Sequence, residues 1–271
     1  MNLIFITNNC LHAAVAQEAG VDYIMVDLEI LGKEARQGHL NTVISRHTIE
    51  DVRLVRSVID RSRLMVRINP IFDGSQEEID QCIEANVDVI MLPMFTKVAE
   101  VDKFIDLVAG RARTCLLLET PQAFVRVDQI MRCSGVDSFH VGLNDLHLGM
   151  GLDFMFELLA YGQVEWLANQ FIDHGIEFGF GGVARLNTGM LSSRLILSEH
   201  VRLGSNQVIL SRDFHRIFDE PFEAARRHFC AEIASLRNEL HRLRQCSAKE
   251  LEGNSVDVKH VVSDLIARKC G

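Results

Sequence analysis

Short apolar runs recur along the chain at regular intervals, and a segment with helical spacing of apolar residues follows almost every one. Apolar runs of this length, bounded by polar residues, predict buried strands. We predict strands over residues 3–6, 23–27, 64–68, 89–92, 114–118, 138–141, 177–180 and 207–210. We predict helices over residues 10–19, 48–62, 76–85, 98–108, 123–133, 164–174 and 190–203.

This alternation favours an α/β fold with a parallel sheet, because strands that are apolar throughout need cover on both faces. Eight strand–helix units close into a (β/α)8 TIM barrel, which we expect over residues 1–220 as the catalytic domain. An open doubly wound sheet is the alternative. The absence of a GxGxxG motif after the first predicted strand disfavours it.

The pattern changes from about Pro221, where apolar residues take up a heptad spacing that predicts a long helix. Gly253-Asn254-Ser255 is expected to break this helix, and a second amphipathic segment follows. We expect residues 221–271 to form a C-terminal helical extension that joins copies of the chain into a homo-oligomer. A helical hairpin packed on its own barrel is the alternative.

Charge and cysteine usage narrow the class of partner. The chain has 28 Lys and Arg against 37 Asp and Glu, a formal net charge of −9. That balance argues against nucleic acid or an anionic membrane as the main partner. The seven cysteines occur singly, without a CxxC pair, so neither a disulfide framework nor a zinc knuckle is indicated. With no apolar stretch of membrane-spanning length and no secretion signal, we expect a cytoplasmic protein.

Polar side chains gather where the predicted strands end. In a barrel these ends converge on one face, where such folds carry out their chemistry. Capping of the next helix or a structural ion pair would explain any one of these residues alone, but the set favours a shared site. The residues are Asp27, Glu29, Arg67, Glu119, Asn144 and Asp145.

Two of these carboxylates, Glu119 and Asp145, are the metal ligands that we expect. Carboxylates with water suit Mg²⁺ or Mn²⁺, which keep open positions for a substrate. A 2-oxo acid could chelate such an ion, and Arg67 could then stabilise the charge of an enolate oxygen. We expect Asp27 and Glu29 to orient Arg67 or waters. The amides of Gly142, Leu143, Asn144 and Asp145 could bind the substrate carboxylate.

Five stretches, taken in order, resemble the HpcH/HpaI aldolase and citrate lyase β-subunit family. They lie at residues 20–29, 66–69, 87–94, 118–120 and 142–146. The resemblance implies a phosphoenolpyruvate/pyruvate-type barrel in which Glu119 and Asp145 match the metal ligands and Arg67 matches the substrate arginine. It also implies a C-terminal helix that is exchanged between subunits.

The chain departs from the pyruvate aldolases of that family at two positions. Ile30 stands where they carry a histidine for the acid/base step, and Leu117 stands where they carry a glutamine. The general base therefore stays unassigned, with His39 and His47 as candidate replacements. Lys33 and Arg36 could bind a distal carboxylate or phosphate of a second substrate.

Together these features predict a divalent-metal-dependent carbon–carbon lyase of aldolase type. It would act through a metal-stabilised enolate of a 2-oxo acid, a pyruvate-derived aldol or a related acyl thioester. The alternative is a non-catalytic relative that binds a 2-oxo acid or a protein partner, and the missing histidine motivates it.

Overall fold

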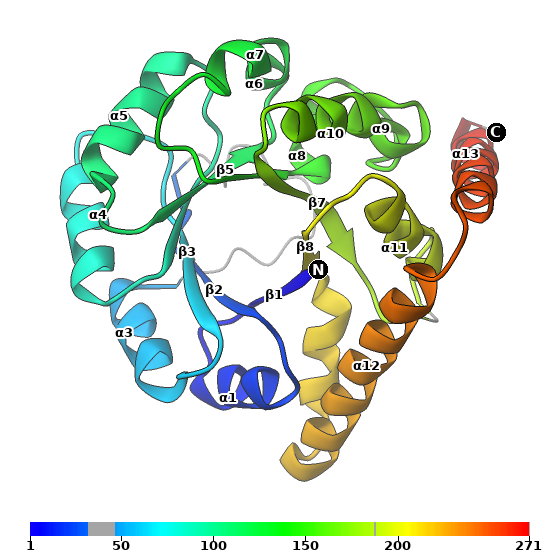
Figure 1. The fold of residues 1–271 in the computed structure, drawn as a ribbon. Coiled ribbons are helices and arrows are strands. Elements are labelled where there is room, and N and C mark those ends of the chain that lie inside the picture. The colour runs from blue at the N-terminus through cyan, green and yellow to red at the C-terminus, as the bar shows by residue number, and fades with distance from the viewer. Residues whose placement is uncertain (32–46, 187, 271) are drawn as a thin grey trace. The chain divides into compact units, whose positions relative to one another are not determined.

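The computed structural model describes residues 1–31, 47–186 and 188–270. In these residues eight strands form a closed barrel in the order β1 to β8, with helices between the strands, which confirms the predicted (β/α)8 class (Figure 1). The strands are β1 (Asn2–Ile6), β2 (Tyr23–Asp27), β3 (Arg63–Arg67), β4 (Val89–Leu92), β5 (Arg113–Leu118), β6 (Ser138–Val141), β7 (Glu177–Val183) and β8 (Gln207–Leu210).

The helices follow the strands as the apolar spacing predicts, although several shorter ones were not foreseen. They are α1 (Cys10–Glu18), α3 (Ile49–Val58), α4 (Ser75–Glu84), α5 (Val98–Val108), α6 (Pro121–Val125), α7 (Val127–Ile130), α8 (Leu143–Gly149), α9 (Glu157–Ala160), α10 (Gln163–Asp173), α11 (Ser193–Arg202), α12 (Phe222–Leu243) and α13 (Ala248–Cys270). A 3₁₀ helix, η1 (Arg212–Asp219), precedes α12. The single helix predicted over residues 123–133 is instead split into α6 and α7 at Arg126.

The chain divides into two compact units. The first unit is Ile4–Phe139, and the second unit combines Met1–Leu3 with His140–Gly271. In the first unit, parallel pairing sets the register of the strands that carry the candidate site: Asp27 of β2 lies opposite Arg67 of β3, and Arg67 lies opposite Met91 of β4. These strands are almost completely buried, as their continuous apolar sequence predicts.

The predicted break at Gly253-Asn254-Ser255 is wrong, because α13 runs through these residues. The break lies earlier, where Ser247 Oγ accepts the N–H of Glu250 and Glu250 Oε2 accepts the N–H of Ser247. This reciprocal cap starts the new helix. The polar residues inside α13 bind α11 instead: Asn254 Nδ2 donates to Ser198 Oγ at 2.8 Å.

Helix α13 packs on α11 and α9 within the second unit. Its boundary with α11 contains Glu199, which is completely buried and forms two hydrogen bonds with Arg202, of 3.0 and 2.8 Å. Ser255 of α13 lies 3.5 Å from the same carboxylate. The contact with a second copy of the chain, and the division of the chain at residue 220, stay predictions. None of the described helices combines the length and hydrophobicity that a membrane span needs.

Two features of the core of the second unit bear on its stability. His200 is completely buried, stacks on Phe180 at 3.7 Å between ring centroids, and pairs its Nδ1 with Ser205 Oγ at 2.8 Å. Gly179 of β7 lies opposite Gln207 of β8, and a Cβ at Gly179 would overlap the backbone oxygen of Gln207. Gly179 therefore permits the close approach of these two strands.

Candidate active site at the carboxyl ends of β2, β3 and β5

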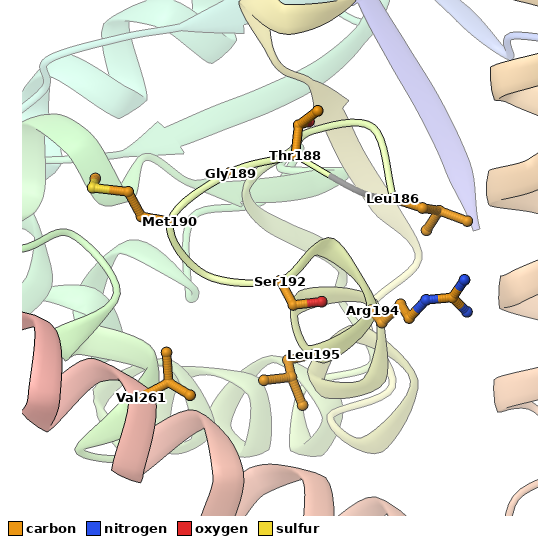
Figure 2. A pocket seen from close by; sticks show the side chains of 8 residues that line it. All are labelled: Leu186, Thr188, Gly189, Met190, Ser192, Arg194, Leu195 and Val261. Carbon is orange, nitrogen blue, oxygen red and sulfur yellow. The ribbon is translucent and has the colours of Figure 1, made fainter.

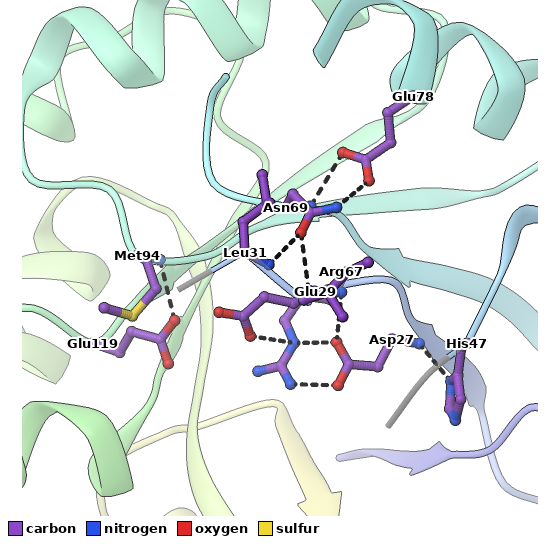
Figure 3. A network of polar contacts seen from close by, with 10 residues as sticks. Asp27, Glu29, Leu31, His47, Arg67, Asn69, Glu78, Met94 and Glu119 are labelled. Atoms are coloured by element: carbon purple, nitrogen blue, oxygen red, sulfur yellow. Dashed lines mark hydrogen bonds and ion pairs between the residues drawn. The ribbon is translucent and has the colours of Figure 1, made fainter. Parts of the chain in front are cut away.

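The centre of the candidate site is a two-point ion pair between neighbouring strands. Arg67 Nε donates to Asp27 Oδ1 at 2.8 Å, and Arg67 Nη2 donates to Asp27 Oδ2 at 2.7 Å (Figure 3). Both residues end their strands, and the strand register places them opposite each other. Asp27 is 2% exposed, whereas the Arg67 side chain retains 16% of its exposure. The pair therefore fixes the plane of the guanidinium but leaves part of it accessible.

Further carboxylates surround the same guanidinium. Glu29 Oε2 lies 3.5 Å from Arg67 Nε, and the N–H of Glu29 donates to Asp27 Oδ1 at 3.2 Å. Burial alone would lower the pKa of Arg67, but the charge and hydrogen bonds of Asp27, then the charges of Glu29 and Glu119, outweigh it. The pKa of Arg67 is therefore raised above its ordinary value, and the side chain is a permanent cation.

Arg67 keeps donor capacity for a ligand. Within the described part of the chain, its Nη1 group has no hydrogen-bond acceptor. A guanidinium presents five N–H donors, and Asp27 takes only two of them. The outer edge of Arg67 can thus bind an anionic oxygen without breaking its bond to Asp27.

Glu119 follows β5, and hydrogen bonds to the segment after β4 hold this part of the chain in place. Glu119 is 3% exposed, and its Oε1 accepts the N–H of Met94 at 3.1 Å (Figure 3). The next residue, Thr120, donates its hydroxyl to Phe95 O at 2.7 Å. The segment after β4 is thereby tied to the end of β5 at two successive positions.

A second network fixes the segment after Glu29. Asn69 Oδ1 accepts the N–H groups of both Ile30 and Leu31, each at 2.9 Å. Asn69 is itself held by Glu78, which accepts its side-chain N–H at 2.6 Å and its backbone N–H at 3.1 Å. Burial raises the pKa of Glu78, although the bonds from Asn69 oppose that shift.

The structure brings four of the predicted site residues together in the first unit: Asp27, Glu29, Arg67 and Glu119. His47, a candidate base, directs its Nδ1 to the backbone N–H of Asp27 at 3.0 Å. His39, Lys33 and Arg36 lie outside the described residues.

The remaining predicted residues lie in the second unit, around the start of α8. Gly142 precedes the helix, Leu143 is buried, Asn144 is exposed and Asp145 is half-buried. The first amides of a helix have no partner inside the helix, so those of Leu143, Asn144 and Asp145 are donors by position. Among the described side chains, no three His, Cys, Asp or Glu residues cluster in a way that could hold a metal ion.

Three residues of the site were not found from the sequence. Asn69 and Met94 lie in the stretches 66–69 and 87–94 that resemble the family, but the sequence predicts no role for them or for Glu78. Asn69 directly follows the predicted strand 64–68, so its position was a usable signal. The contact between Glu78 and Asn69 could not be inferred, because it depends on how α4 packs.

The second unit has a cavity of its own, of about 450 Å³, beside the start of α11. Its lining includes Thr188, Met190 and Ser192 from the loop after β7, Leu195 of α11 and Val261 of α13 (Figure 2). None of the predicted site residues lines it.

One family model and several solved structures match this chain. Residues 3–155 match the family model described as HpcH/HpaI aldolase/citrate lyase. The crystal structure of an HpcH/HpaI aldolase from Desulfitobacterium hafniense DCB-2 is similar at a TM-score of 0.60 and 15% identity, covering 78% of this chain and 85% of that one. An HpcH/HpaI aldolase/citrate lyase family protein from Burkholderia cenocepacia J2315 gives a TM-score of 0.62 at 14% identity, covering 80% and 90%. At these identities the two structures show a shared fold. A search of curated proteins gave no match.

Proposed function

The chain belongs to the HpcH/HpaI aldolase/citrate lyase family, and from that premise we propose that it is a divalent-metal-dependent carbon–carbon lyase. Its substrate would be a 2-oxo acid, an aldol derived from one, or a related acyl thioester. The reaction would pass through an enolate, which is formed when the bond between the α and β carbons of the carbonyl compound breaks and its electron pair moves toward the carbonyl.

The observation that carries this proposal is the fixed guanidinium of Arg67. When an enolate forms, negative charge moves onto the former keto oxygen, and a donor already aimed at that oxygen stabilises the transition state. Asp27 holds Arg67 through two hydrogen bonds, so its outer N–H groups are oriented before the substrate binds. Glu29, at 3.5 Å, limits the freedom of the guanidinium further.

Carboxylate and water oxygens are the ligands that a hard cation prefers. Glu119 and Asp145 would hold Mg²⁺ or Mn²⁺, with waters and substrate oxygens at the remaining positions. When bound, such an ion supplies Lewis-acid activation of the keto group. Glu119 fits the role because its carboxylate is buried and near enough to Arg67 to raise the pKa of that residue. The amides of Gly142, Leu143, Asn144 and Asp145 would receive the substrate carboxylate.

One observation favours the alternative of a non-catalytic relative that binds a 2-oxo acid. Ile30, which is 49% exposed, occupies the position after Glu29, and its aliphatic side chain cannot transfer a proton. A lyase would then need another base, and the Nδ1 of His47 is engaged by the N–H of Asp27.

The test is exchange of the methyl protons of pyruvate in D₂O, followed by NMR with and without Mg²⁺. A lyase that forms the enolate exchanges these protons, whereas a relative that only binds does not. The expected result is Mg²⁺-dependent exchange in the wild type and none in Glu119→Gln. Glu165→Gln, which changes a glutamate bonded to Arg202 in the second unit, serves as the control and should exchange normally. Metal-dependent exchange that persists in Glu119→Gln would refute the ligand assignment.

A further inference from the structure

Met94 has a backbone conformation that its side chain does not favour. Its φ is +53°, in the left-handed region that residues with a Cβ rarely adopt. Two other described residues besides glycine share this conformation, Asn86 at +55° and Ala109 at +51°. Both of these lie at the ends of helices α4 and α5, where a left-handed residue is a common way to stop a helix.

Met94 lies at no helix end. It follows Pro93 just after β4, three residues before the Lys97 cap of α5. A residue held against its conformational preference persists only when the structure around it fixes it, and such residues cluster at functional sites. We therefore expect the left-handed conformation of Met94 to permit a specific contact.

That contact is the hydrogen bond from the N–H of Met94 to Glu119 Oε1, at 3.1 Å (Figure 3). The two residues after Met94 are also held by hydrogen bonds. Phe95 O accepts the hydroxyl of Thr120 at 2.7 Å, and the N–H of Thr96 donates to Glu100 Oε2 at 2.6 Å. The left-handed turn at Met94 is thus held from its C-terminal side, and its N–H is directed at the buried carboxylate.

We propose that Met94 is a positioning residue whose left-handed backbone orients the carboxylate of Glu119 for its ligand. This inference rests on the proposed function, since it concerns the same carboxylate. A carboxylate offers about four acceptor directions, and the Met94 N–H takes one at Oε1. Fixing that oxygen sets the rotation of the carboxylate and hence the direction of its remaining lone pairs.

The proposal assigns the role to the backbone of Met94 and not to its thioether, and a substitution series separates the two. Valine is branched at Cβ and strongly disfavours the left-handed region, so Met94→Val should move the N–H away from Glu119. Glycine adopts this region freely. Met94→Gly keeps the N–H in place while it removes the whole side chain.

Ala109 supplies the matched control, because Ala109→Val imposes the same conformational penalty at the end of α5. We expect Met94→Val to weaken Mn²⁺ binding, measured by calorimetry, by about 10–100-fold, as loss of a hydrogen bond to a metal ligand does elsewhere. Met94→Gly should restore most of that affinity. Ala109→Val should destabilise the protein to a similar extent with Mn²⁺ binding intact.

A double-mutant cycle gives a readout that needs no metal. The loss of stability on Met94→Val should be smaller in the Glu119→Gln background than in the wild type, because the charged acceptor is already gone. Additive losses, or unchanged Mn²⁺ binding in Met94→Val, would overturn the role of Met94 even if the wild type is a lyase. A Met94→Gly variant as impaired as Met94→Val would shift the role to the side chain and overturn it too. A wild type that neither binds Mn²⁺ nor exchanges pyruvate protons would refute the proposed function itself, and the positioning role with it.

Discussion

Asp27→Asn tests whether the charge of Asp27 holds Arg67 in the orientation that the proposed chemistry needs. Asparagine has the same shape but only one acceptor oxygen, so one of the two hydrogen bonds, 2.8 and 2.7 Å, is lost. A hydrogen bond to a charged group contributes about 1.5–3 kcal/mol, and the remaining bond loses its charged acceptor.

The total loss of stability in Asp27→Asn depends on the charges that remain around Arg67. Removing one partner of a buried ion pair costs about 3–5 kcal/mol. Glu29 and Glu119 still lie near the guanidinium, so the loss should fall at the low end, about 3 kcal/mol. The measurement is urea unfolding at pH 7, followed by circular dichroism. The same variant should exchange pyruvate protons about 100-fold more slowly, because a misplaced catalytic group costs that much.

Asp213→Asn is the matched control. Asp213 also forms two hydrogen bonds with an arginine, Arg185, at 2.8 and 3.2 Å, but in the second unit and with the Arg185 side chain 23% exposed. Loss of the Asp213–Arg185 ion pair should lower the free energy of unfolding by about 1 kcal/mol, as for partly exposed pairs. It should leave the exchange of pyruvate protons intact. If Asp27→Asn unfolds at the wild-type urea concentration, or if both variants lose exchange equally, the orienting role of Asp27 is wrong.

Two further predictions concern the second unit. Burial, then His140 and the N-terminal amino group, hold the pKa of His200 well below 6.5. The unfolded chain then binds a proton that the folded chain does not, so the free energy of unfolding should fall below pH 6.5 by up to about 1.4 kcal/mol per pH unit. His200→Phe should reduce that slope by nearly one proton in urea titrations from pH 5 to 7, and parallel curves would contradict this. Gly179→Ala should destabilise by about 1–3 kcal/mol in thermal unfolding, because its Cβ meets the backbone of Gln207. Gly253→Ala on α13 should not destabilise the protein, because the added Cβ meets no other atom. If both variants lose the same stability, the clash with Gln207 is not the cause.

The order and the ends of the strands could be predicted closely from the sequence. The predicted strands 23–27, 89–92, 138–141 and 207–210 agree with β2, β4, β6 and β8 at both ends. Buried parallel strands consist mainly of apolar residues, and polar residues at or after their ends, such as Glu119 after β5, help to mark where they stop. The helix over 98–108 was predicted with equal accuracy.

The prediction failed where a polar residue has a partner distant in sequence. Gly253-Asn254-Ser255 has the composition of a loop, but Asn254 and Ser255 satisfy their side chains on α11, so the helix continues. The candidate site shows the same limit. The sequence placed Asp27 and Arg67 at strand ends, whereas their two-point contact follows from the register of β2 and β3. The left-handed conformation of Met94 could not be predicted from the sequence, because methionine is not a residue expected in that region.

The make-up of the second unit limits how the gene can be divided. Met1–Leu3 belong with His140–Gly271, and they are bound there: Asn2 N–H donates to Asn206 O, and Arg237 donates to Met1 O. Dividing the chain at one position therefore cannot give two fragments that each contain one complete unit. A fragment that starts at His140 would lack Met1 O, the acceptor for Arg237. Residues 1–3 would have to be fused to that fragment to supply it.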